Sequence, residues 1–279
     1  MVLSEIVGQK VLDLRPLPGG CVGEVYQAGL ADGRTVVVKV DSRPQPQLHL
    51  EGFMLTYLAQ HSQLPVPQVL HSTPELLVMA FVPGDSHFDV ATERDAAAHL
   101  ATLHRITTPQ FGLSQDTLIG GLPQPNPWTT RWLDFFRDQR LLYMARFALD
   151  ARQLPGSMMA RLEKLAGQLP RWLEEPTQPA LIHGDVWTTN VLAERGRVTG
   201  FIDPAIYYAH PEIELAFITL FGTFGQTFFA AYQEQNPIAP GFWNERRDLY
   251  NLYPLLVHVR LFGGGYIASV DQTLRRFGC

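Results

Sequence analysis

The hydrophobic pattern of the chain changes near residue 83, and this change constrains the fold more than any other feature of the sequence. Before it, short runs rich in β-branched residues have the length and composition of strands. These runs occupy residues 21–28, 34–40 and 76–82. Between the second and third runs, Leu48, Leu55 and Leu58 fall on one helical face. Residues 1–82 therefore predict a small β-rich lobe with one helix.

After residue 83 the apolar residues recur with the longer period of helices. The helical segments are 92–106, 128–150 and 157–169. Residues 112–127 are rich in glycine and proline and predict an irregular loop, whereas 180–185 and 190–203 predict a short strand and a hairpin. We therefore expect an α+β fold of two lobes, in which residues 83–279 form the larger and mainly helical lobe.

Residues 215–232 carry no charge and are nearly long enough to cross a bilayer. Glycine, glutamine and threonine dilute the segment, and Glu212, Glu214 and Glu234 border it. No second apolar segment with basic flanks supports insertion. A buried helix is the favoured interpretation, and no membrane partner is expected.

The formal charge of −5, without any run of basic residues longer than a pair, excludes the electrostatic footprint of nucleic-acid binding. The 279 residues contain two cysteines, Cys21 and Cys279, which form neither a disulfide framework nor a metal-ligand spacing. The first residues also lack the basic and apolar regions of a secretory signal. A reducing compartment, the cytoplasm, is therefore expected.

The segment "LIHGDVWTTN", residues 181–190, carries the clearest chemical pattern. It holds Asp185 and, five residues later, Asn190, and Asp203 follows in "GFIDPA". The spacing matches the catalytic loop of protein kinases, in which an aspartate accepts the proton of the attacking hydroxyl, while an asparagine and a second aspartate hold Mg²⁺. The pattern predicts phosphoryl transfer from ATP, with Asp185 as the base and Asn190 and Asp203 as magnesium ligands.

Phosphate-binding groups precede this segment in the order that a kinase requires. Lys39 ends the strand "VVVKV", and Glu51 lies on the following helix, where it can orient the lysine. The stretch "LPGGCVGEVYQA" contains Gly19, Gly20 and Cys21, whose backbone N–H groups could cover phosphates. Cys21 is, in addition, a candidate for reversible oxidation.

Each of these residues taken alone has a structural explanation. A glycine cluster can be a hairpin turn, a lysine or glutamate can lie on a solvated face, and Asp203 before a proline can belong to a turn. His183 is expected to be a structural hydrogen-bonding residue rather than a base. Five groups in the correct order are poorly explained by chance, and this favours the catalytic interpretation.

The sequence resembles the fructosamine kinase family, a branch of the aminoglycoside-phosphotransferase-like and protein-kinase-like fold. The segments "HGDVWTTN" and "DPAIYYAHPEIELA" carry the resemblance most specifically, because Trp187 and the Tyr-Tyr-x-His sequence are not shared by small-molecule kinases in general. Further similar segments, "LEGFMLTYL" and "LYNLYPLLVHVRLFGGGY" among them, extend the resemblance over nearly the whole chain.

The resemblance implies ATP- and Mg²⁺-dependent phosphorylation of the 3-hydroxyl of a ketosamine, a ribulosamine or fructosamine that is free or bound to protein. A phosphate at C3 lies beta to the C2 carbonyl, so enolisation toward C1 can expel it and release the amine, a repair of glycation. Residue by residue, the resemblance gives Asp185, Asn190, Asp203 and Lys39 the roles stated above. It implies adenine contact by the backbone of Met79, Ala80 and Val82, and substrate contact by Trp187 and His258.

Two departures from the family pattern concern substrate preference and the catalytic loop. Val257 and Arg260 differ from the family's residues near the expected sugar site, and "TTN" replaces a common Ser-Gly-Asn ending. A kinase of another small alcohol, of aminoglycoside or choline type, stays open as the nearest alternative because fold does not define substrate. A non-catalytic nucleotide-binding module is the alternative from a different class.

Overall fold

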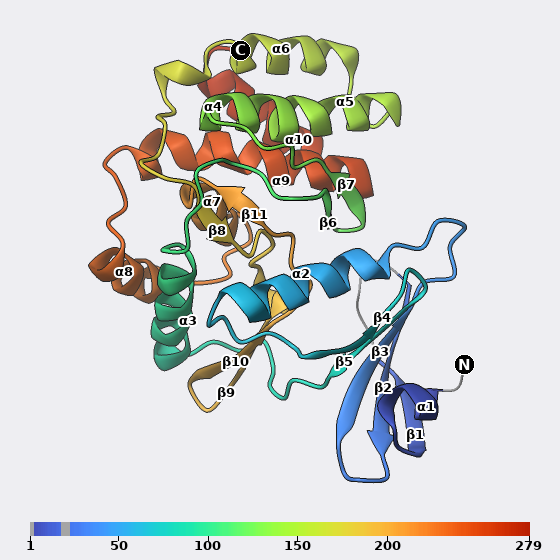
Figure 1. The fold of residues 1–279 in the computed structure, drawn as a ribbon. Helices are drawn as coiled ribbons and strands as arrows, with labels where there is room; N and C mark the ends of the chain where they lie inside the picture. The colour runs from blue at the N-terminus through green and yellow to red at the C-terminus, as the bar shows by residue number, and fades with distance from the viewer. Residues whose placement is uncertain (1–2, 18–22) are drawn as a thin grey trace.

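The computed structural model describes residues 3–17 and 23–279, and its N-terminal region is built on a five-stranded antiparallel sheet (Figure 1). The strand order is β1-β2-β3-β5-β4. The strands are β1 (Val11–Pro16), β2 (Glu24–Leu30), β3 (Thr35–Val40), β4 (Val69–Ser72) and β5 (Leu76–Ala80). The three strands predicted from the sequence are thus β2, β3 and β5, and the edge strands β1 and β4 were not predicted.

The alternation of side chains along β3 gives the sheet two different faces. Val36 and Val38 pack with Val78 on the face covered by the short helix α1 (Leu3–Val7). The intervening residues, Val37 and Lys39, lie on the opposite face, beneath helix α2 (Leu48–His61). Lys39 therefore points toward α2 because of its position in the strand.

Helix α2 connects the sheet to the rest of the molecule. Its residues Leu48 and Leu55 pack on Leu77 and Met79 of the sheet, whereas Leu58 is buried in the large core of the C-terminal region. All three leucines of the predicted helical face are at most 3% exposed. The predicted helix is confirmed, and its apolar residues serve two cores rather than one.

The C-terminal region is mainly helical and surrounds the long helix α9 (Arg247–Phe262), which packs against α5, α7 and α10 (Figure 1). The other helices are α3 (Val90–Leu103), α4 (Trp132–Phe135), α5 (Leu142–Asp150), α6 (Gly156–Ala166), α7 (Glu212–Leu220), α8 (Gln226–Gln235) and α10 (Tyr266–Arg276). The expected mixed architecture, with a β-rich N-terminal part and a helical C-terminal part, is confirmed.

Three short strand pairs lie between these helices. They are β6 (Thr117–Ile119) with β7 (Leu122–Gln124), β8 (Ala180–Ile182) with β11 (Tyr207–Ala209), and β9 (Val191–Glu194) with β10 (Arg197–Phe201). The predicted turn between β9 and β10 has positive φ at Arg195 and Gly196, as a tight two-residue hairpin requires. The first pair was not predicted, since residues 112–127 were expected to be irregular throughout.

The uncharged segment 215–232 forms two helices instead of the single buried helix expected. Helix α7 ends at Leu220 and α8 begins at Gln226, with Gly222 in the left-handed region at φ +64° between them. Glycine adopts this conformation without the penalty of a side chain, which explains the break. Among the described residues, no helix combines the length and apolar character needed to span a membrane.

The predicted helix 128–150 is also interrupted. It starts at Trp132 as α4, passes through a π-helical turn at Phe136–Leu141 and continues as α5. A second π-helical turn, Phe242–Arg246, precedes α9, and 3₁₀ turns occupy Leu169–Arg171 and Thr188–Asn190. Such turns do not change hydrophobic periodicity enough to be recognised in a single sequence.

Candidate active site

Lys39, Glu51 and Asp203 form an ion network between the sheet and the C-terminal region, in which Lys39 is buried and the two carboxylates are partly exposed. The Nζ atom of Lys39 lies 2.7 Å from Oε1 of Glu51 and also donates to Oδ1 of Asp203. Burial acts to lower the pKa of Lys39, but the two carboxylates outweigh it and raise that pKa above its ordinary value. The lysine is therefore a fixed ammonium group with a defined direction.

Asp185 lies in the tight turn that the glycine before it permits. Gly184 has φ +86°, and a Cβ atom there would lie 2.0 Å from the carbonyl oxygen of Ala205. The Oδ2 atom of Asp185 accepts a hydrogen bond of 2.9 Å from Nδ2 of Asn190, which also donates to the Asp185 carbonyl. Burial, followed by repulsion from Asp203, raises the pKa of Asp185 to about 8.

Asp203 has a left-handed backbone, at φ +52°, which few residue types other than glycine tolerate. Burial acts to raise its pKa, but Lys39 outweighs burial and lowers it, so the group is a carboxylate. The backbone N–H of the preceding residue, Ile202, donates to the carbonyl of Asn190 at 2.9 Å. This bond holds the two predicted magnesium ligands on neighbouring segments.

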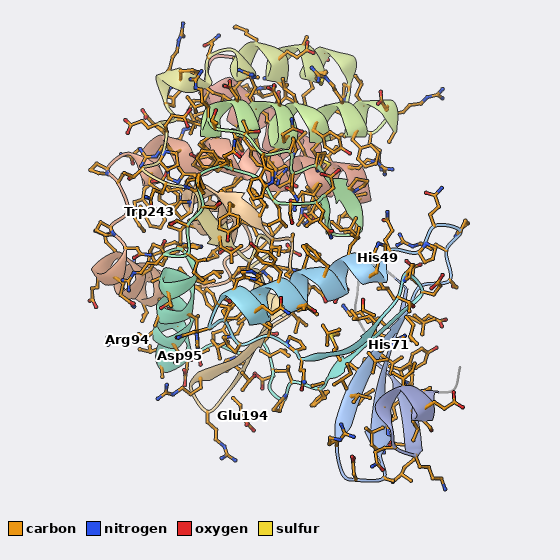
Figure 2. All side chains as sticks on the ribbon, in the orientation of Figure 1. His49, His71, Arg94, Asp95, Glu194 and Trp243 are labelled. Carbon is orange, nitrogen blue, oxygen red and sulfur yellow. The ribbon has the colours of Figure 1, made fainter. Side chains whose placement is uncertain are left out.

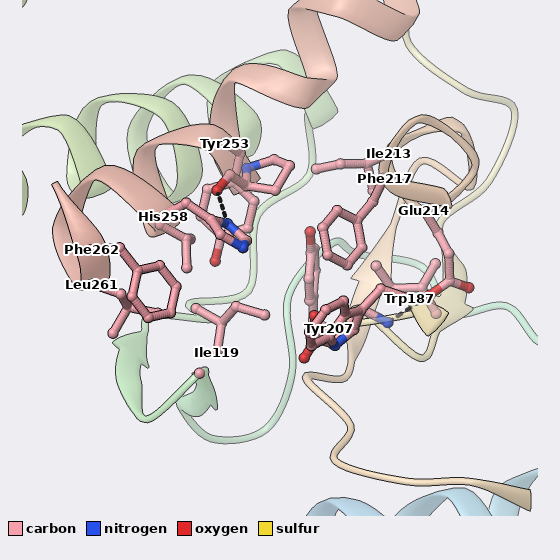
Figure 3. A pocket seen from close by; sticks show the side chains of 16 residues that line it. Ile119, Trp187, Tyr207, Ile213, Glu214, Phe217, Tyr253, His258, Leu261 and Phe262 are labelled. Carbon is pink, nitrogen blue, oxygen red and sulfur yellow. Dashed lines mark hydrogen bonds between the residues drawn. The ribbon is translucent and has the colours of Figure 1, made fainter. Parts of the chain in front are cut away.

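Two pockets meet at Asp185. The first, called here the phosphate pocket, is lined by Lys39, Glu51, Asn190 and Asp203. The second, called here the acceptor pocket, has an empty volume of about 640 Å³ and a mostly apolar lining that includes Tyr253, Val257 and Phe262 (Figure 3). Asp185, Trp187 and Gly120 line both pockets. A group bound in either pocket therefore reaches the same carboxylate.

The phosphate pocket offers oxygen donors of the kind that Mg²⁺ prefers. No cluster of three or more His, Cys, Asp or Glu side chains suited to a metal is found in residues 3–17 and 23–279. Mg²⁺ prefers oxygen ligands and takes one or two protein groups together with substrate phosphates. The carboxylate of Asp203 and the amide oxygen of Asn190 fit that requirement, since the Asn190 nitrogen is already directed toward Asp185.

Trp187 and His258, the two predicted substrate residues, both line the acceptor pocket. Nδ1 of His258 lies 2.8 Å from the carbonyl oxygen of Pro254, which can only accept, so this nitrogen carries the proton. Burial lowers the pKa of His258, so the ring is neutral and its Nε2 atom is an acceptor. Trp187 is partly buried, with its ring centre 6.1 Å from that of Phe221.

The other described residues that were predicted to contact the nucleotide are not among those that line the two pockets. Met79 is 4% exposed and packs beneath α2, the N–H of Ala80 donates to Gln68 O, and Val82 lies against Gly200. None of these three residues, which were predicted to contact adenine, lines either pocket at Asp185. Gly19, Gly20 and Cys21 lie outside the described residues.

Glu214 is an important residue that the sequence interpretation missed. Its Oε1 atom accepts a hydrogen bond of 2.6 Å from the N–H of Gly184, and Oε2 lies 2.8 Å from Nε2 of His104. His104 in turn bonds the hydroxyl of Tyr232 at 2.6 Å. A glutamate inside an otherwise apolar helix was the available signal, because a buried charge almost always has partners.

The β6–β7 hairpin was missed as well, and its Gly120–Gly121 tip reaches the phosphate pocket. Gln124 anchors its base, since its Nε2 atom donates to Thr117 Oγ1 at 2.8 Å and its Oε1 atom accepts from Tyr253 at 2.7 Å. A predicted irregular loop thus proves to be a fixed wall of both pockets.

Comparison with known proteins places this geometry in a family. The family model described as fructosamine kinase matches residues 1–277. The chain is 34% identical to a protein of Synechocystis named "Probable ketoamine kinase", over 98% of this chain and 94% of the relative.

Two solved structures extend the comparison to the fold. A fructosamine-3-kinase candidate from Thermobifida fusca superposes with a TM-score of 0.88 at 32% identity, covering 98% of this chain and 95% of the other. A thermostable mutant of an aminoglycoside phosphotransferase superposes with a TM-score of 0.67 at 20% identity, covering 99% and 98%. This second likeness shows the fold alone and confirms the expected kinase-like architecture. By the family model and the identity to its relatives over nearly the whole chain, the protein belongs to the fructosamine kinase family.

Proposed function

We propose that the protein transfers the γ-phosphoryl group of ATP to the 3-hydroxyl of a ketosamine, with Asp185 as the base. The observation that carries this proposal is that Asp185 lines both the phosphate pocket and the acceptor pocket. Phosphoryl transfer requires the attacking hydroxyl to lie between its base and the γ-phosphate. One carboxylate at the junction of a charged pocket and an apolar pocket meets that requirement.

On the phosphate side, Lys39 would contact the phosphates of ATP and Glu51 would hold the lysine in place. Asp203 and Asn190 would ligate Mg²⁺, which supplies positive charge near the β- and γ-phosphate oxygens when it is bound. The backbone of Met79, Ala80 and Val82 would meet adenine, and the Gly19–Cys21 segment would cover the phosphates. The ammonium of Lys39 and the carboxylate of Asp203 have the charges these roles need.

On the acceptor side, Asp185 would receive the proton of the 3-hydroxyl as the O–P bond forms. Its pKa of about 8 lies near physiological pH, where a carboxylate both accepts and releases a proton readily. Trp187 would place the apolar face of the sugar, and the unprotonated Nε2 of His258 would accept a hydrogen bond from a hydroxyl or from the substrate nitrogen. Glu214 would hold the turn at Gly184 in register.

The lining of the acceptor pocket favours a ketosamine over a polycationic aminoglycoside. Among the described residues that line it, the carboxylates are those of Asp185 and Glu214, and Glu214 is already bonded to Gly184 and His104. A polycation would require several free carboxylates in such a site. Retention of Lys39, Asp185, Asn190 and Asp203 likewise argues against a non-catalytic module.

Consumption of ATP over a panel of ribulosamines, fructosamines, aminoglycosides and choline tests the proposal. We expect turnover with the ketosamines and a product that carries phosphate on O3, as phosphorus NMR would identify. Turnover confined to aminoglycosides or choline would overturn the assignment.

Two further proposals concern organisation and location. We place the boundary between a nucleotide-binding lobe and a catalytic lobe near residue 83, where the chain leaves the sheet after β5. We also propose a cytoplasmic location, because two cysteines in 279 residues are typical of a protein in a reducing compartment.

A further inference from the structure

Three aromatic side chains that line the acceptor pocket, those of Trp187, His258 and Phe262, are joined through Phe221 into a continuous row, and the four side chains are called here the aromatic rim. Successive ring centres are 6.1 Å apart from Trp187 to Phe221, 4.8 Å from Phe221 to His258, and 5.6 Å from His258 to Phe262. The four residues come from the catalytic loop, the turn after α7, and α9. Figure 3 shows Trp187, His258 and Phe262 around the cavity.

The rim is not a part of the hydrophobic core. Phe262 is 62% exposed and Phe221 is 37% exposed, although both are large apolar side chains. Exposed aromatic residues that adjoin a pocket are typical of ligand contact rather than of packing. The mouth of the acceptor pocket therefore offers aromatic surface to whatever extends out of it.

Charge is almost absent from this side of the pocket. The described lining residues include neither lysine nor arginine, and the two carboxylates, of Asp185 and Glu214, belong to the catalytic loop and its support. The rim includes no acidic side chain and His258 is neutral. A cationic substituent would therefore lose hydration there and gain only the weak attraction of a cation for aromatic rings, whereas an apolar ring buries its area without that loss.

The chemistry of a ketosamine defines which part of it would reach the rim. Its nitrogen is attached to C1, two carbons from C3, so a 3-hydroxyl at Asp185 leaves the nitrogen a few ångströms from that carboxylate, in the pocket that Trp187 also lines. The substituent on that nitrogen then points out of the sugar site. Since the rim adjoins the apolar end of the pocket, the substituent meets its aromatic rings.

We propose that the aromatic rim binds the nitrogen substituent of the substrate and selects ketosamines of apolar, and above all aromatic, amines over those that carry a second positive charge. The proposal rests on the proposed ketosamine kinase function. It adds to the rim, above all to Phe262, a role in amine selection beyond the sugar contacts proposed for Trp187 and His258 and beyond the transfer of phosphate.

Steady-state kinetics with three fructosamines that share one sugar test this selection. The amines are methylamine, benzylamine and 1,5-diaminopentane, the last of which leaves a free ammonium group. We expect kcat/KM for the benzyl compound to exceed that for the methyl compound about tenfold, from burial of one ring against the rim. The aminopentyl compound should be no better than the methyl compound. Equal values for all three, or a preference for the aminopentyl compound, would overturn the proposal.

The variant Phe262→Ala tests whether the rim causes the preference for the benzyl compound. So exposed a side chain can be removed with little loss of stability. The variant should lose most of the benzyl preference through KM, so that the ratio of its kcat/KM values for the benzyl and methyl compounds falls toward one, while KM for ATP changes little. Trp243→Ala is the matched control, since Trp243 is 43% exposed and packs on Phe229 and Phe242 away from the pocket (Figure 2). Retention of the full benzyl preference in Phe262→Ala would contradict a role for the rim.

The kinetic experiments distinguish an error in the assignment of the rim from an error in the proposed function. If the protein does not phosphorylate ketosamines, none of the three fructosamines consumes ATP. If only the assignment of the rim is wrong, all three are phosphorylated and the substituent or the Phe262 substitution has no effect.

Discussion

The two pockets that meet at Asp185 are built in opposite ways. The phosphate pocket depends on a few charged groups in direct contact, with the ammonium of Lys39 between the carboxylates of Glu51 and Asp203. The acceptor pocket is formed by aromatic and aliphatic side chains from the catalytic loop, α7 and α9. In the proposed function, the chemistry of phosphoryl transfer is thus concentrated in few residues, whereas selection of the acceptor is distributed over a surface.

The difference predicts how each pocket responds to substitution. Charges in contact are coupled, so the loss of one changes the protonation of the others and acts well beyond its own hydrogen bonds. Apolar contacts are nearly additive and each contributes in proportion to the area it buries. Substitutions at the junction and in the phosphate pocket should therefore have large effects on turnover and on Mg·ATP binding. Substitutions in the acceptor pocket should have moderate effects on KM for the ketosamine.

The largest effect is expected at the junction itself. Asp185→Asn keeps the shape of the side chain and a hydrogen-bond acceptor for Asn190 but removes the base, so kcat should fall about 10³-fold. Calorimetric titration should show Mg·ATP binding within a few-fold of that of the unsubstituted protein. Asp138→Asn is the control, because Asp138 is an exposed carboxylate paired with Arg137 on the surface. Loss of nucleotide binding equal to that of an Asp203 variant would contradict the assignment of the base.

On the phosphate side, Asp203→Asn should weaken Mg·ATP binding about 100-fold, since it removes a charged ligand and leaves Lys39 with Glu51 alone. Binding of the ketosamine, measured without nucleotide, should change little if the two pockets are separate. Asp32→Asn is the control, because the carboxylate of Asp32, in the turn between β2 and β3, bonds only the exposed Arg34 among its polar partners in the described structure. Unchanged nucleotide affinity in Asp203→Asn would remove Asp203 from the metal site.

The positions of the charged residues on the phosphate side could largely be predicted from the sequence because they follow from local rules. Strand periodicity directs Lys39 toward α2, and the five-residue spacing brings Asn190 to Asp185 within one turn. The same locality made β2, β3, β5 and α2 predictable. The contact of Lys39 with Asp203, which are 164 residues apart, depends in contrast on how the sheet packs on the C-terminal region.

The acceptor side was only partly predictable, because its walls depend on packing between segments distant in sequence. Trp187 and His258 were identified by resemblance, but the rim residues Phe221 and Phe262 gave no local signal. The break between α7 and α8 was missed, although Gly222 lay within the segment, because apolar composition outweighed one glycine in the interpretation. Glu214 was noted as a border charge, and only its contacts with Gly184 and His104 reveal its role.

A smaller expected effect concerns stability. It arises from the charge of Asp185 and not from the hydrogen bond of Asp185 with Asn190. The pKa of Asp185 is raised to about 8 in the folded protein, above its ordinary value of 3.8. The folded state therefore binds a proton that the unfolded state releases between these pH values, and its stability falls as pH rises from about 4 to about 8. The variant Asp185→Asn has no titratable group at this position, so its stability does not fall with pH in this way. The carboxylate that is proposed as the base therefore reduces the stability of the folded protein.

Urea unfolding at pH 4.5, 6 and 8.5 measures the effect. The free energy of unfolding of Asp185→Asn should nearly equal that of the unsubstituted protein at the lowest pH and exceed it by about 2 kcal/mol at the highest, a value reduced because Asp185 is only partly buried. Asp138→Asn should show no such trend. A difference that is constant with pH would mean that the folded protein does not raise this pKa.

Trp187 gives the smallest expected effect and the sharpest test of the acceptor side, because a partly buried indole can serve either as a substrate platform or as a core anchor. As a platform it contacts the apolar face of the sugar, and Trp187→Ala should raise KM for the ketosamine about tenfold while KM for ATP and Tm stay nearly unchanged. Trp132→Ala provides the reference for a core anchor, because Trp132 is fully buried and its Nε1 donates to Tyr250 at 3.0 Å. That substitution should cost about 3–5 kcal/mol of stability. If Trp187→Ala loses stability as Trp132→Ala does, and its folded fraction keeps normal ketosamine kinetics, Trp187 is scaffolding. The acceptor pocket would then depend on its aromatic residues for shape rather than for contact with the sugar.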